Sequence, residues 1–126
     1  MTPFKKCLAP EEKIVYLEAL VYIMNVEKRN LKEIQEYLDQ QAQEIGFPPA
    51  ELKSIKKLRK SEDLVKELRK INSLRLRRYI VREMIMLAIS DHEITDQEMC
   101  SIYKIGTGAG IKEEMINDFF LWAAQG

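Results

Sequence analysis

Apolar residues recur every three to four positions along seven stretches of this chain, and polar turns separate the stretches. This spacing places apolar side chains on one face of a helix, whereas no stretch alternates apolar and polar residues as a half-buried strand does. Helix start and stop residues divide the pattern. The predicted helices cover about residues 10–27, 30–46, 49–58, 61–71, 74–90, 95–105 and 112–124. The sequence therefore predicts an all-α fold.

Glycines and apolar spacing refine the ends of this pattern. Gly46 follows the second predicted helix, and the stretch from Gly106 to Gly110 follows the sixth. Glycine commonly ends a helix because it adopts the left-handed conformation without steric cost. In the last helix Met115, Ile116, Phe119 and Trp122 have helical spacing. We therefore expect Phe119 and Trp122 to be core anchors.

A weak internal repeat relates two parts of the chain. The two copies cover about residues 10–47 and about residues 74–111. Each copy contains an apolar helix, a turn and a second helix that is followed by Gly and an apolar residue. Matching positions in the two copies are 63 to 64 residues apart in the sequence. Repeated helix pairs of this kind can each cover the apolar face of the other. The sequence therefore predicts two pseudo-symmetric helix-turn-helix pairs. A connecting segment of about 48–73 joins them in one domain over residues 1–126.

The formal net charge is zero, but its distribution is uneven. Residues 53–82 contain twelve bases and three acids, so this basic segment carries +9 and the flanks together carry −9. Such a segment can neutralise phosphates, and it offers a nucleic-acid-binding or anionic-surface-binding function as the alternative hypothesis. Its bases are spread over three predicted helices, with Tyr79 as the single aromatic residue. We therefore favour solvated faces and ion pairs with the acidic flanks, and expect no nucleic-acid partner.

Two cysteines, Cys7 and Cys100, lie far apart without a metal-binding spacing. They do not form a disulfide framework, which favours a reducing, cytoplasmic setting. The first residues lack the apolar core of a signal peptide, and the longest apolar run, 19–24, is too short to span a membrane.

Four carboxylates lie within eight residues between two apolar helices: Asp91, Glu93, Asp96 and Glu98. Calcium and magnesium are held by several oxygen ligands, and carboxylates are their usual donors in proteins. This acidic turn is therefore the candidate site for one divalent cation. The same residues also fit a purely structural interpretation, because Thr95 and Glu98 have the spacing of a capping box. Asp96 in the first turn is favoured by the helix dipole.

Catalytic chemistry has little support in the sequence. The sole histidine, His92, has no visible nucleophile or acid partner, and we interpret it as a solvated turn residue. Phosphate-binding glycine motifs and a nucleophile elbow are absent from the sequence. We therefore expect no catalytic residue, no bound cofactor other than the candidate cation, and a protein that is not an enzyme.

The run from Met84 to Glu98 resembles the signature of the TerB-like family of tellurite-resistance-associated domains. In that family an apolar helix ends in an Asp-Gly turn, which an aliphatic residue and a helix-starting Glu follow. Here His92 stands at the Gly position, and Gly110-Ile111 matches the family's closing pair. The resemblance covers nearly the whole chain and implies seven helices in two related pairs.

The resemblance also implies a function. It indicates a non-catalytic binding or adaptor module of a bacterial stress-response system, with another protein as its partner. Divalent-metal binding is associated with the acidic turns of the family. In the first repeat Lys28 and Arg29 stand where the second has Asp91 and His92. Any cation site is therefore expected at the second turn alone.

Overall fold

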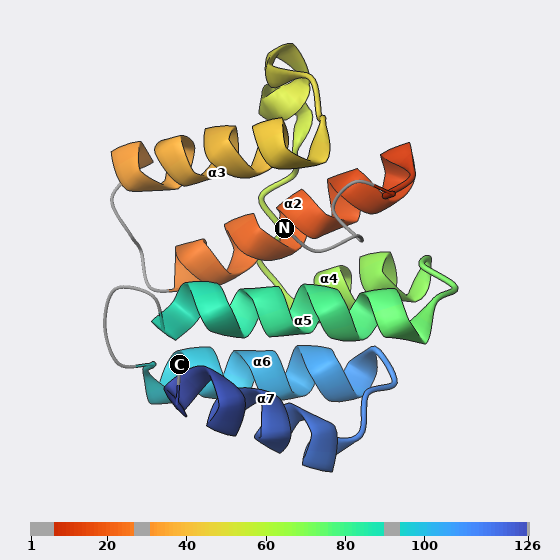
Figure 1. Ribbon diagram of the computed structural model, residues 1–126, viewed down its shortest axis with the longest axis vertical. Helices are drawn as coiled ribbons and strands as arrows, with labels where there is room; N and C mark the ends of the chain where they lie inside the picture. Colours follow the sequence, from red (N-terminus) through yellow and green to blue (C-terminus); the bar gives the residue numbers. More distant parts are fainter. Residues whose placement is uncertain (1–6, 27–30, 90–93, 126) are drawn as a thin grey trace.

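The computed structural model describes residues 7–26, 31–89 and 94–125, and these residues form helices and short connections without any strand (Figure 1). The helices are α2 (Pro10–Val26), α3 (Leu31–Ile45), η1 (Pro49–Ser54), α4 (Ser61–Arg69), α5 (Leu74–Ile89), α6 (Asp96–Gly108) and α7 (Glu113–Gln125). The predicted all-α fold is confirmed for this part of the chain. The third element differs from the prediction, because it is a 3-10 helix that ends at Ser54, before Leu58.

Helix α2 lies at the centre of the fold. Its residues from Val15 to Met24 are buried without interruption, because α2 packs against α3, α4, α5 and α6. A helix that is apolar on all sides is stable only when neighbours cover every side. Figure 1 shows α3 and η1 on one side of α2, and α5, α6 and α7 on the other.

Helix α6 extends further than the sequence predicted, through Gly106 to Gly108. These two glycines do not stop the helix; they allow close packing. A Cβ atom on Gly106 would lie 2.6 Å from Ile116 Cδ1, and one on Gly108 would lie 2.8 Å from a Val65 methyl group. Small residues at these positions let α6 approach both α7 and α4.

The stops of α3 and α6 match each other. Gly46 and Gly110 have φ angles of 74° and 89°, the left-handed region that favours glycine. Phe47 N donates to Ala42 O at 2.8 Å, and Ile111 N donates to Gly106 O at 3.0 Å, as in a Schellman motif. Both helix pairs are thus present as elements, and α2 packs against α5. A pseudo-symmetric relation between the pairs stays a prediction.

A polar cluster lies inside the interface of α2, α3 and α5. The hydroxyl of Tyr16 donates to Gln41 Oε1 at 2.8 Å, and that of Tyr79 lies 3.4 Å from Glu83 Oε1. The rings of Tyr16 and Tyr79 stack with centroids 6.3 Å apart. Burial raises the pKa of the Tyr16 hydroxyl far above its usual value, and the Glu83 carboxylate raises it further. Tyr16 therefore stays protonated and serves as a hydrogen-bond donor in the core.

In the described ranges, no helix combines the length and the apolar character that crossing a membrane requires.

Candidate functional site

The acidic turn is only partly described. Asp91, His92 and Glu93 lie outside the described residues, so the structure places only the two later carboxylates. Asp96 is exposed in the first turn of α6, whereas Glu98 is buried. Thr95 N donates to Glu98 Oε1 at 3.1 Å, and Glu98 N donates to Thr95 Oγ1 at 3.1 Å. The predicted capping box is confirmed.

This geometry gives Glu98 a structural role, because its carboxylate completes the start of α6. Among residues 7–26, 31–89 and 94–125, no three His, Cys, Asp or Glu side chains gather as cation ligands. Cation binding by Asp91, Glu93, Asp96 and Glu98 stays a prediction.

Several cations of the basic segment have local structural roles. Lys70 Nζ lies 3.1 Å from a Glu67 oxygen. The guanidinium of Arg77 donates to Ile71 O at 2.8 Å and to Ala109 O at 2.9 Å, which ties the start of α5 to the end of α6. These bases contribute to the fold as well as to the surface charge.

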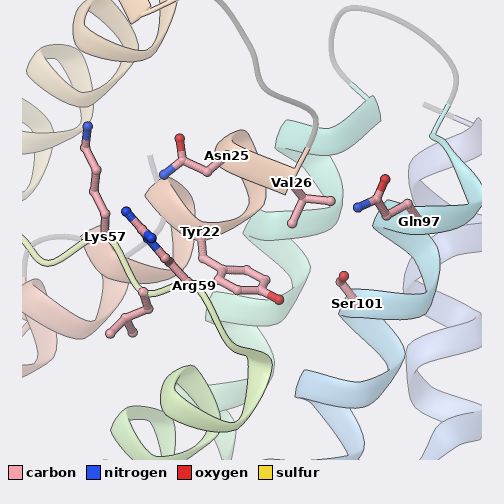
Figure 2. A pocket seen from close by; sticks show the side chains of 8 residues that line it. Tyr22, Asn25, Val26, Lys57, Arg59, Gln97 and Ser101 are labelled. Atoms are coloured by element: carbon pink, nitrogen blue, oxygen red, sulfur yellow. The ribbon is translucent and has the colours of Figure 1, made fainter.

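Two other bases of the segment line a pocket beside α2. Lys57 and Arg59 come from the link between η1 and α4, and they border the pocket together with Tyr22 from α2 (Figure 2). The pocket, here called the Tyr22 pocket, has a volume of about 510 Å³. Its other polar lining residues are Asn25 of α2 and Gln97 and Ser101 of α6. Three segments that are distant in sequence therefore meet at one concave site.

The C-terminal half of α7 exposes apolar side chains to solvent, in contrast to the polar lining of the Tyr22 pocket. Leu121 is 62% exposed and Trp122 is 53% exposed. The expectation that Trp122 is a core anchor is therefore wrong. Ile116 is fully buried and Phe119 is half-buried, so α7 docks through its first turns. We call Leu121 and Trp122 the α7 tip.

A cation accompanies the α7 tip. The guanidinium carbon of Arg82 lies 5.3 Å from the ring centroid of Trp122 and 5.3 Å from that of Tyr79. A guanidinium between two aromatic faces is held in place by cation–π attraction. Within the described part of the chain, no carboxylate pairs with Arg82. The α7 tip therefore presents an apolar surface next to a positioned positive charge.

Sequence reasoning missed both the Tyr22 pocket and the exposure of the α7 tip. The pocket depends on contacts between residues up to 79 positions apart, which helical periodicity does not reveal. The α7 tip did carry a signal. Four large apolar residues stand in succession from Phe119 to Trp122, and successive helical residues point about 100° apart. A helix at the edge of a domain cannot bury all four.

We found no match to this chain among protein-family models, curated proteins or solved structures.

Proposed function

We propose that this protein is a non-catalytic binding module of the adaptor type, which docks a partner protein on the α7 tip. The exposure of Leu121 and Trp122 carries the proposal. Single exposed apolar residues are common, but adjacent large ones beside a positioned cation suggest an interaction site. Tryptophan and arginine are also the residue types that most often dominate binding energy at interfaces.

The charge at the α7 tip defines the chemistry of the partner. Arg82 is held between Tyr79 and Trp122, so a carboxylate that approaches it gains a charge-assisted hydrogen bond without first ordering the guanidinium. A matching partner segment carries an apolar side chain that covers Leu121 and Trp122, with an Asp or Glu beside it.

The wider setting follows the family resemblance. In this proposal the chain is a TerB-like domain of a bacterial stress-response system related to tellurite resistance, and it works in the cytoplasm. One divalent cation, calcium or magnesium, binds at the turn of Asp91, Glu93, Asp96 and Glu98. Because Glu98 caps α6, this cation would draw mainly on the other three carboxylates.

The alternative function is binding of nucleic acid or an anionic surface through residues 53–82. Such binding requires that many bases converge on one phosphate backbone. The dispersal of Lys70, Arg77 and Arg82 to separate structural contacts weighs against this alternative.

Site-specific photo-cross-linking in the host cell tests the docking proposal. A photo-reactive residue at position 121 should yield one discrete adduct with a different protein. The same residue at position 14 is a matched control, because Ile14 is also a partly exposed apolar residue, on α2. Arg82→Glu should suppress the adduct at position 121.

Calorimetry with the purified partner then measures affinity. Loss of a tryptophan at the centre of an interface typically costs about 2 kcal/mol or more. Trp122→Ala should therefore weaken binding at least about thirtyfold, whereas Ile14→Ala should leave it unchanged. Equal adducts at positions 14 and 121, an adduct that contains only a second copy of this chain, or unchanged affinity of Trp122→Ala would overturn the proposal.

A further inference from the structure

The Tyr22 pocket shares no lining residue with the docking proposal and has its own chemistry. It forms where the last turns of α2, the link between η1 and α4, and the first half of α6 meet. A volume of about 510 Å³ falls within the usual range for small-molecule sites. Six of the described lining residues are polar, and the other two are aliphatic. The polar residues are Tyr22, Asn25, Lys57, Arg59, Gln97 and Ser101.

None of these six side chains makes a hydrogen bond or ion pair with another residue in the part of the chain that the structure describes. Other exposed bases of the segment, such as Lys60 and Lys66, also lack a hydrogen bond or ion pair among the described residues, so the distinguishing feature is that these six side chains meet at one pocket. Tyr22 is the most informative of the six. Only 6% of its residue surface is exposed, so its ring forms an inner wall of the pocket. Its hydroxyl has no partner among the described residues and stays accessible to solvent at the pocket.

The electrostatics of the pocket favour an anion. Lys57 and Arg59 supply two positive charges, and none of the described lining residues is acidic. Gln97 lies in the first turn of α6, where the backbone dipole adds positive potential. Two cations without a counter-charge match a phosphate monoester, whose charge near neutral pH is about −1.5 to −2.

The arrangement of the polar groups gives the ligand two distinct ends. Figure 2 shows the side chains of Lys57 and Arg59 on one side of the Tyr22 ring, and Gln97 and Ser101 on the other. The Tyr22 hydroxyl points towards the Ser101 side. One end of the pocket thus offers cations, and the other offers hydroxyl and amide groups that can both donate and accept hydrogen bonds.

From this geometry we infer that the Tyr22 pocket binds a small hydroxylated organic phosphate, such as a sugar phosphate. Lys57 and Arg59 hold the phosphate, with the planar guanidinium suited to two parallel hydrogen bonds. Tyr22, Gln97 and Ser101 bind the hydroxyl groups.

Ribose 5-phosphate is a suitable probe, because D-ribose and inorganic phosphate represent its two halves. Titrations followed by NMR should shift the side-chain amide signals of Asn25 and Gln97, and ribose 5-phosphate should bind more tightly than either half. Each charge-assisted hydrogen bond lost typically weakens binding about tenfold or more. Lys57→Ala with Arg59→Ala should therefore reduce affinity for ribose 5-phosphate by at least that factor. Tyr22→Phe with Ser101→Ala should bring it closer to the affinity for inorganic phosphate, with Gln97 as the remaining contact to the hydroxyl groups.

The matched control removes the same charge elsewhere. Lys60 and Lys66 are exposed bases outside the pocket lining. Lys60→Ala with Lys66→Ala should change the affinity by no more than about threefold, because exposed charges at a distance contribute little. Equal weakening by the two double variants would show a diffuse charge effect and overturn the proposal. Binding of a single-stranded oligonucleotide without binding of ribose 5-phosphate would overturn it in favour of nucleic acid.

Discussion

Helices α2 and α7 are equally rich in apolar residues but have opposite surroundings. Eleven of the 17 residues of α2 and eight of the 13 residues of α7 are apolar. Ten consecutive residues of α2 are buried, whereas in α7 only Ile116 is. The difference comes from the neighbours. Four helices pack around α2, but α7 packs against α5 and α6 at the edge of the fold. The number of apolar residues therefore limits how much apolar surface a helix can bury. The helix's position in the fold determines how much of that surface is buried.

The largest expected effect is a difference in stability between two variants, one with a leucine replaced in α2 and one with a leucine replaced in α7. Leu17 of α2 is fully buried and Leu121 of α7 is 62% exposed. Leu17→Ala should lower the free energy of unfolding by ~2–5 kcal/mol, because it removes core contacts and leaves a cavity. Leu121→Ala should change it by less than about 0.5 kcal/mol. Denaturant unfolding measures both, and similar losses at the two positions would contradict the comparison.

A second prediction concerns the one buried anchor of α7. Gly106→Ala places a Cβ atom against Ile116 Cδ1 and should cost ~1–3 kcal/mol by overpacking, although alanine is the better helix former. The control is the same change in an Ile116→Val background, which lacks the clashing atom. There the cost of Gly106→Ala should fall markedly in a double-mutant cycle. An unchanged cost would mean that Ile116 does not set the approach of α7 to α6.

A third prediction is that replacing Trp122 lowers the free energy of unfolding less than replacing a tryptophan usually does. Its cation–π contact with Arg82 is worth about 0.5–1 kcal/mol, and half of its surface is already in water. Trp122→Ala should therefore cost ~1 kcal/mol in unfolding free energy, against ~3–5 kcal/mol for a fully buried tryptophan. Ile116→Ala in the same helix should cost more than Trp122→Ala. The reverse order would place the anchor of α7 at its tip.

The smallest effect concerns the acid inside α2. Glu18 is 2% exposed, and burial raises the pKa of its carboxyl, with Glu67 raising it further. A raised folded-state pKa adds stability at low pH that is lost as pH rises through that pKa. Glu18→Gln does not titrate, so it should melt higher than the wild type near neutral pH. The difference should vanish at acidic pH. Melting temperatures of both proteins across this range provide the measurement, and a constant difference would exclude ionisation of Glu18 as the cause.

Most of the fold was predictable because local signals determine it. Thr95 with Glu98 marked the start of α6, and Gly46 marked the end of α3. The sequence failed where distant residues decide the outcome. Gly106 and Gly108 read as helix stops, but Ile116 and Val65 pack against them. Trp122 had core spacing, yet about half of its surface stays exposed because α7 lies at the edge of the described fold.

The sites were less predictable than the fold. The carboxylates of the acidic turn were visible as a cluster, and the structure describes only Asp96 and Glu98 of the four. The Tyr22 pocket could not be predicted from the sequence. Lys57 and Gln97 have the pattern of ordinary surface residues, and only the fold brings them to one cavity.

The polar cluster between α2, α3 and α5 also provides an internal reporter of opening. The Tyr16 hydroxyl contacts Gln41 and Glu83, which are 25 and 67 residues away along the chain. Its proton can exchange with water only when these three helices separate, so local fraying at the chain ends leaves it protected. The exchange rate of the Tyr16 hydroxyl proton would therefore report the rate at which the core opens. A docked partner or bound ligand that slows this opening would also slow the exchange.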